Sequence, residues 1–293
     1  MRIDITKSCL LLILVIPILI SCSLERKIAS KYIKNKDKIS IVLTFPKYIV
    51  KTNLNTNSLQ DKEFLSDDVI DSLLYFKSQY LQNIIDSVFL KYAENNFIKE
   101  MVLYGIKVYN PDDYKKINNT GKRIYFFKLA QIQLEETTQE IVPKDLGYKL
   151  DKVQRSKSID YVSSMKQIRV NSINVNSWYE LSKADSTEIY PMLFSSYYVT
   201  DNVDGWYDYD FDNPAFQNGA FRFNIQPMSQ FDLYEFLALT ARHNAINLYD
   251  YMLNHHIQNN LPKGKIPNAY YHYDRENKLL TKFNKDCFAE IDP

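Results

Sequence analysis

The segment from Asp201 to Asp212 concentrates the residue types that could do chemistry. Five Asp side chains alternate there with four aromatic ones: Trp206, Tyr207, Tyr209 and Phe211. Several carboxylates can bind Ca²⁺, which prefers many oxygen ligands. Aromatic rings can stack on a sugar or pack against a protein partner. We expect an exposed hairpin or partner surface formed by these aromatic residues.

The calcium alternative has a partial motif. Asp208, Asp210 and Asp212 have the spacing that begins an EF-hand loop. Asn213 stands where that loop needs glycine, and Gly219 stands where it needs a bidentate Glu. We therefore predict no metal and no cofactor.

The histidines do not form a recognisable catalytic or metal-binding motif. His243, Asn247, Asp250 and Asn254 share one helix face, which we expect to be solvated. Adjacent His255 and His256 would point about 100° apart on a helix and cannot converge on one metal. A hydrolase would need His243 or His272 in a cleft with an Asp and a hydroxyl. We predict that the protein is not an enzyme and has no catalytic residues.

Glycine and charge exclude further classes. The six glycines are too far apart for a P-loop, a dinucleotide-binding turn or a nucleophile elbow. Lys and Arg number 36 against 35 Asp and Glu. Nucleic-acid binding depends on clustered basic residues, so this balance argues against it.

Residues 1–21 are predicted to be a secretory signal. Arg2 and Lys7 precede an apolar run from Cys9 to Ile20, which is shorter than the about 20 residues that span a bilayer. The run ends in Leu-Ile-Ser-Cys at positions 19–22, which resembles a bacterial lipobox. That resemblance implies cleavage between Ser21 and Cys22 and acylation of Cys22, for example with palmitate. The alternative is an ordinary signal peptide with a chance cysteine.

The residues after Cys22 indicate the location. Ser23 is not the Asp that retains some lipoproteins in the inner membrane, so we expect an outer-membrane anchor facing the periplasm. Residues 22–38 are predicted to be a lipidated polar tether. Cys287 is the one cysteine left, so the fold cannot rest on an internal disulfide.

Hydrophobic periodicity in residues 39–260 predicts an α+β domain. We expect a mixed β-sheet with two long helices packed on one face. The predicted helices are 67–103, with a break near 95–96, and 230–260; the predicted strands are 39–45, 106–109, 123–135, 168–181, 189–200 and 221–226. Residues 47–66 are expected to be a loop, Asp204-Gly205 a turn, and 261–293 an irregular tail.

This order of elements resembles ABC-type transport auxiliary lipoproteins, and also lipopolysaccharide-assembly lipoproteins and uncharacterised Gram-negative envelope lipoproteins. The resemblance covers roughly residues 39–258. Its matching pieces are Gly105–Val108, Phe126–Gln133, Asn176–Leu181 and the helix from Asp232 to Ile257. Segment 201–228 and the tail after 260 depart from the pattern. The resemblance implies a non-catalytic protein that docks onto a transporter, a lipid-transfer protein or an outer-membrane barrel.

The favoured hypothesis is therefore a lipid-anchored accessory protein of an envelope transport or assembly complex, held at the membrane by acyl chains and bound to an envelope protein. The second is a lipoprotein that binds a glycan or a lipid tail. A lipid tail would need a large apolar pocket under residues 69–89. The third and least favoured is an envelope hydrolase.

Overall fold

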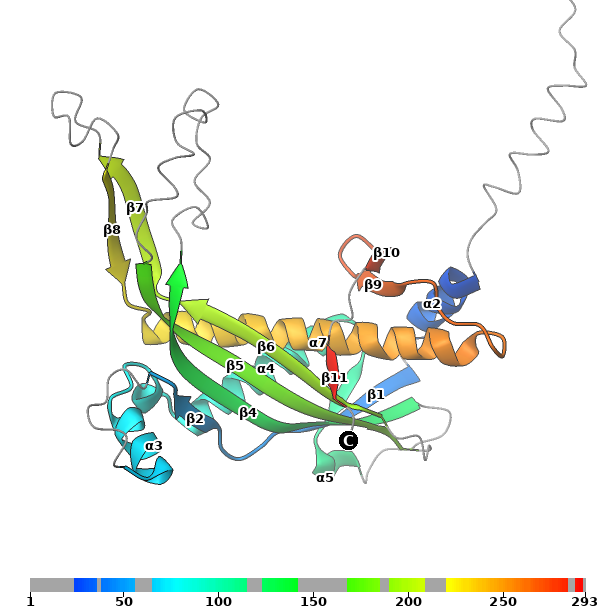
Figure 1. Ribbon diagram of the computed structural model, residues 1–293. Coiled ribbons are helices and arrows are strands. Elements are labelled where there is room, and N and C mark those ends of the chain that lie inside the picture. The colour runs from blue at the N-terminus through cyan, green and yellow to red at the C-terminus, as the bar shows by residue number, and fades with distance from the viewer. Residues whose placement is uncertain are drawn as a thin grey trace, which may run out of the picture.

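The computed structural model describes residues 24–35, 38–55, 65–114, 123–141, 168–184, 190–208, 220–283 and 288–291 (Figure 1). The predicted signal sequence, its cleavage site at Ser21 and Cys22, and Tyr209, Phe211 and Cys287 lie outside these ranges. Trp206 and Tyr207 are described by their backbone alone.

A mixed sheet forms the centre of the fold. Its strand order is β11-β6-β5-β4-β1-β3, and β2 also pairs with β4. The long antiparallel hairpin of β4 (Arg123–Ile141) and β5 (Ile168–Lys183) continues into β6 (Met192–Thr200). Strand β1 (Ile39–Thr44) lies parallel to both β4 and β3 (Lys107–Tyr109). The predicted strands 123–135, 168–181 and 189–200 are confirmed.

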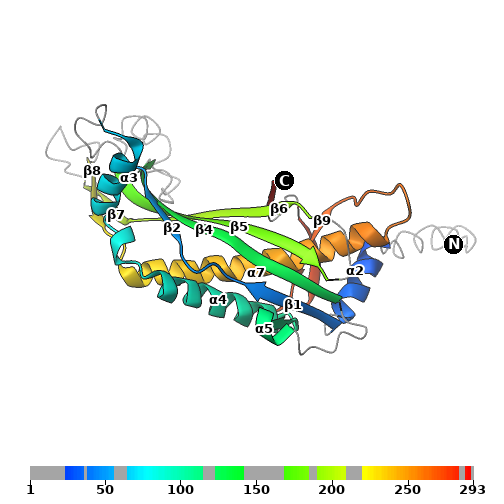
Figure 2. The same ribbon diagram turned by 90° about the horizontal axis from the view of Figure 1, so that it is seen from below.

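Two long helices cover one face of this sheet. Helix α4 (Asp86–Leu103) and helix α7 (Gln230–Asn260) pack against each other along the strands (Figure 2). Phe127 of β4 is stacked between Phe97 of α4 and Tyr179 of β5, with ring centroids 5.5 and 4.9 Å apart. Burying these aromatic faces between layers contributes to the core. The predicted α+β class is confirmed.

The predicted 67–103 helix is interrupted elsewhere than expected. Helix α3 (Asp67–Phe76) ends before a short 3₁₀ turn, η4 (Leu81–Asn83), and α4 then begins at Asp86. No break occurs at 95–96. The chain leaves the helix because the backbone N–H groups of Gln79 and Tyr80 donate to the Glu136 carboxylate. A distant side chain thus replaces the helical hydrogen bonds.

Local sequence signals lie at the ends of several elements. Gly105 ends α4 with a φ of 79°, a left-handed conformation that suits glycine. Short helix α5 (Pro111–Tyr114) has Pro at its first position. At the start of α7, Ser229 and Asp232 form a reciprocal capping box.

Two predicted irregular segments contain strands. Residues 47–66 include β2 (Val50–Asn53), which pairs with β4 at Gln133–Glu136. Asp204-Gly205 is not a turn, because it lies within β7 (Asn202–Asp208), which pairs with β8 (Ala220–Gln226).

The prediction of a polar tether is wrong for residues 24–34. They form helix α2 (Leu24–Lys34), which packs on α7. Ala29 and Tyr32 are 0% exposed. The Tyr32 ring lies 6.0 Å from that of Tyr249 and 5.0 Å from that of His256. Ile28, Ala29, Tyr32 and Ile33 share the face of α2 that packs on the core, and this apolar face is enough to dock the helix.

The C-terminal tail is not irregular either. Strand β9 (Tyr270–Asp274) pairs with β10 (Leu279–Phe283), and β11 (Ala289–Ile291) extends the central sheet beside β6. Isolated strands of three to five residues have weak periodicity. Their pairing partners, which are far away in sequence, decide their structure.

Strand β9 fastens α2 to α7. Asn254 of α7 accepts the Tyr271 N–H and donates to the Tyr271 carbonyl, at 2.8 and 2.7 Å. Glu25 of α2 accepts the Tyr271 hydroxyl at 2.5 Å and the Asn268 N–H at 2.7 Å. The predicted solvated face of α7 is therefore wrong at Asn254, which β9 covers.

The predicted solvated face of α7 is also wrong at Asp250, which is fully buried. Its carboxylate accepts the Tyr273 N–H at 3.0 Å and lies 2.6 Å from His272 Nδ1. Burial raises the pKa of Asp250. The hydrogen bond to Asp250 is the main cause that raises the pKa of His272, with Asp274 adding to it.

We predict that His272→Asn destabilises the fold more in acid than in alkali. A raised folded-state pKa means that protonated His272 stabilises the fold below its unfolded pKa of about 6.5, and that this contribution is lost as pH rises through the folded pKa. The variant should lose about 2 kcal/mol near pH 5.5 and less near pH 8.5 by urea denaturation.

The control is His243→Asn, because burial lowers the pKa of His243. Its effect on stability should have the opposite pH dependence. A His272→Asn effect that is constant from about pH 5.5 to about pH 8.5 would contradict the prediction.

Candidate functional site: a polar pocket at the base of a hairpin

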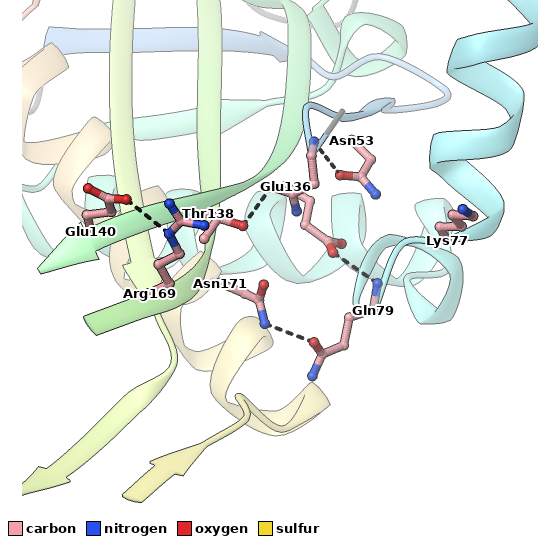
Figure 3. Close-up of a pocket in the computed structure, with 9 residues that line it drawn as sticks. Asn53, Lys77, Gln79, Glu136, Thr138, Glu140, Arg169 and Asn171 are labelled. Carbon is pink, nitrogen blue, oxygen red and sulfur yellow. Dashed lines mark hydrogen bonds and ion pairs between the residues drawn. The ribbon is translucent and has the colours of Figure 1, made fainter. Parts of the chain in front are cut away.

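A pocket of about 530 Å³ lies where β4 ends and β5 begins, on the sheet face that carries the helices (Figure 3). Its volume falls in the range of small-molecule sites. Strands β2, β4 and β5, together with the α3–η4 connection, bring its walls together. Every lining residue is polar or charged: Asn53, Asn55, Lys77, Gln79, Glu136, Thr138, Glu140, Arg169 and Asn171.

Glu136 forms the inner wall of the pocket. Its side chain is 2% exposed and accepts three hydrogen bonds, from the Ser78 hydroxyl at 2.5 Å and from the backbone N–H groups of Gln79 and Tyr80 at 2.9 and 3.1 Å. These donors offset the cost of burying the carboxylate. They occupy three of the about four acceptor sites of the carboxylate and fix its orientation. Glu136 is therefore a positioning residue for the pocket.

Amide side chains complete the walls. Asn53 donates to the Leu74 carbonyl at 2.8 Å and accepts the Asn55 N–H at 3.0 Å. Asn171 donates to the Gln79 side chain at 2.9 Å. These bonds fix the amides before any ligand arrives, and pre-ordered polar groups cost less entropy on binding.

The charges of the pocket cancel. Lys77 and Arg169 are balanced by Glu136 and Glu140. Arg169 Nε donates to Glu140 at 3.0 Å at the outer edge of the pocket. A neutral pocket rich in amides offers both donors and acceptors, which suits a neutral ligand with many hydroxyl groups.

Asp201 ties the pocket to the hairpin formed by β7 and β8. It is 3% exposed and accepts the N–H and the side-chain amide of Asn171, both at 3.0 Å. It also accepts the Met228 N–H at 3.1 Å and the Tyr80 hydroxyl. Burial is the main cause, and Asp201 the second, that raises the pKa of Tyr80. Asp201 is thus a structural anchor. Its carboxylate is already occupied by these donors, which leaves four other carboxylates in segment 201–212 that could bind Ca²⁺.

The hairpin makes a two-stranded sheet of its own. In Figure 1 its strands extend beyond the N-terminal end of α7, away from α2. Trp206 and Tyr207 lie in β7, at register with Arg222 and Phe221 of β8. A lone hairpin is marginally stable in water. Its base at Asp201 therefore decides how the predicted aromatic surface is held.

The histidines do not converge. His255 packs near Tyr190, whereas His256 packs near Tyr32, and burial with the charge of Arg123 lowers the pKa of His256 to about 4. Within the described residues, no three His, Cys, Asp or Glu side chains gather as a metal site.

His272 and Asp250 supply two of the three groups of a hydrolase triad. Among the described residues, no Ser, Thr or Cys side chain bonds to the His272 ring, which otherwise contacts Phe283. The nearby Thr281 hydroxyl donates to the His272 carbonyl instead. The pair serves to attach β9.

The region expected to hold a lipid tail is filled. Leu81, Ile84 and Phe89 belong to the buried core. Among the described helices, none combines the length and apolarity that crossing a membrane requires.

Sequence reasoning did not find the pocket, because its residues come from separate segments that share no motif. One signal was present. Ile132, Leu134 and Glu136 follow the core-facing alternation of β4. A carboxylate in an apolar series must find partners, so Glu136 marks a polar site.

We predict that Asp201→Asn lowers the free energy of unfolding by about 2–4 kcal/mol, because the new amide places a donor against groups that already donate. The matched control is Asp204→Asn, which changes an exposed carboxylate in the adjoining strand β7 and should stay within about 0.5 kcal/mol of the parent. Urea denaturation measures both. Equal effects of the two substitutions would contradict the anchoring role.

Comparisons with known proteins leave the proposed family without support. No protein-family model matches the chain, and no curated protein matches it in sequence. The resemblance to envelope lipoproteins therefore stays a prediction, and the function has to be argued from the geometry.

Proposed function

We propose that this chain is a lipid-anchored, non-catalytic accessory protein that faces the periplasm from the outer membrane. It binds another envelope protein through the β7–β8 hairpin. The observation that carries the proposal is the separation of the two ends of α7. Helix α2 lies at one end and the hairpin at the other (Figure 1).

The anchored end is defined by chain length. Only Ser23 separates Cys22 from Leu24, the first residue of α2. Two residues of chain span about 7 Å at most. An acylated Cys22 therefore holds α2 beside the lipid surface. Because α2 is docked on α7 through Tyr32, the anchor also limits the orientation of the whole domain.

The binding end lies at the start of α7. Met228 and Ser229 join the hairpin to the helix, and Asp201 accepts the Met228 N–H. Helix α7 has 31 residues, a length of about 45 Å at 1.5 Å per residue. The protein thus presents its hairpin far from its anchor, as a spacer between a membrane and a partner would.

We expect the double substitution Trp206→Ala and Tyr209→Ala to reduce recovery of the partner strongly. The experiment is a mild-detergent pull-down of the tagged full chain from native membranes, with mass spectrometry. Removing two aromatic anchors from an interface should reduce recovery at least tenfold, roughly the effect of one or two hot-spot residues.

Tyr48→Ala serves as the control, because Tyr48 is also an exposed aromatic residue but follows β1 and lies outside the hairpin. Cys22→Ala should prevent acylation and partner recovery together. A partner retained by the double variant would exclude the hairpin, and a partner-free parent would contradict the accessory role.

A second candidate function is glycan binding in the polar pocket. Its four amides and balanced charges favour a neutral, hydroxyl-rich ligand over a lipid tail. The walls are already ordered by their own hydrogen bonds, as binding sites are.

For this candidate we expect saturable binding of the mature chain to a glycan array, weakened at least tenfold by Thr138→Arg, a change of about 1.4 kcal/mol. Thr138 lines the pocket, so a longer side chain there should fill it. Gln139→Arg is the matched control, because neighbouring residues of a strand point to opposite faces. Equal effects of the two substitutions, or no binding on the array, would exclude the pocket.

A further inference from the structure

Helix α2 has a basic face that does not contact the protein core. Leu24, Lys27, Lys31 and Lys34 follow each other at i, i+3, i+7 and i+10, and all four are exposed. The buried residues Ala29 and Tyr32 lie on the opposite side. The one acidic residue of α2, Glu25, is buried against Tyr271 and Asn268.

The connection after α7 places further basic residues at the same end of the protein. Lys263 and Lys265 are exposed, and Ile266 is 84% exposed, which is unusual for so apolar a side chain. The 2.7 Å hydrogen bond from the Asn268 N–H to Glu25 holds this connection beside the start of α2. Figures 1 and 2 show both segments at the C-terminal end of α7.

These residues form what we term the basic surface: Leu24, Lys27, Lys31, Lys34, Lys263, Lys265 and Ile266. Neither α2 nor residues 261–267 carries an exposed acidic side chain, and the exposed carboxylate that the structure places near Ile266 is Glu290 of β11. Within the described part of the chain, none of the five lysines forms an ion pair. The chain as a whole is almost neutral, so this concentration of positive charge is local.

We propose that the basic surface lies on a membrane rich in anionic phospholipid. This inference rests on the proposed anchor at Cys22, because chain length keeps the start of α2 within about 7 Å of that residue. Clustered lysines beside an acyl anchor are attracted to anionic headgroups. Their aliphatic stems, together with Leu24 and Ile266, can enter the headgroup region while the charges stay in water.

The two contacts together give the anchor a function beyond tethering. Acyl chains alone would allow the domain to rotate about Cys22. A second contact along α2 fixes the direction of α7, which α2 is docked against, and therefore the direction in which the hairpin points. Acyl chains combined with a basic patch are also a known physical route to stable membrane attachment.

The test uses the mature chain from residue 22 with Cys22→Ser, so that no acyl chain contributes. This chain contains every residue whose contacts build the described fold. Flotation with phosphatidylcholine vesicles, with and without about one third phosphatidylglycerol, measures binding. We expect binding to the anionic vesicles alone, and loss of that binding as salt rises, because salt screens surface charge.

The decisive variant is Lys27→Gln, Lys31→Gln and Lys34→Gln together, which should weaken vesicle binding at least tenfold. The matched control is Lys91→Gln, Lys99→Gln and Lys107→Gln, which removes three exposed lysines from α4 and β3. Circular dichroism checks that both variants fold. Ile266→Ser should weaken binding by a smaller factor, since it removes one apolar contact.

Three outcomes would overturn the proposal: no binding to anionic vesicles, equal loss in both triple variants, or binding to soluble heparin without binding to vesicles. The last result would assign the surface to a soluble polyanion. Palmitate labelling of the full chain tests the anchor separately. Vesicle binding without labelling would refute the acyl anchor at Cys22 and support the basic surface. Labelling without vesicle binding would support the acyl anchor and refute the basic surface.

Discussion

Buried carboxylates that accept hydrogen bonds from other segments hold the outer parts of this protein on its sheet and helices. Glu136 fixes the α3–η4 connection, Asp201 the base of the hairpin, and Asp250 strand β9. Each would cost several kcal/mol to bury alone, and each is compensated by two or more donors. Because most donors are backbone N–H groups, each carboxylate fixes the path of the chain as well as a side chain.

These junctions lie towards the two ends of α7. Near the C-terminal end, Asp250, Asn254 and Glu25 clamp β9 and α2 onto the helix. Near the N-terminal end, Asp201 joins the hairpin, the polar pocket and the first turn. Between them the core is apolar and closely packed, so the two ends of α7 are held rigidly relative to each other. This stiffness suits the proposed spacer and would be of little use to a flexible tether.

The pocket and the hairpin share their supports. Asn171 contacts Asp201 through its backbone and side chain and also donates to Gln79 in the pocket wall. A ligand in the pocket and a partner on the hairpin would therefore act on the same network. Both proposed binding functions can belong to one protein, since the two surfaces are adjacent without overlapping.

The sequence by itself determined the α+β class, most strands, the capping box at Ser229 and the glycine stop at Gly105, because these depend on periodicity and on nearby residues. It did not determine helix α2, strand β9 or the break before α4. These depend on Glu25, Asp250 and Glu136, whose partners lie from 22 to 246 residues away along the chain. Local patterns treat such carboxylates as solvated charges. Only the tertiary structure brings them the donors that make burial favourable, and the same burial creates the pocket and the docked α2 from which its function is argued.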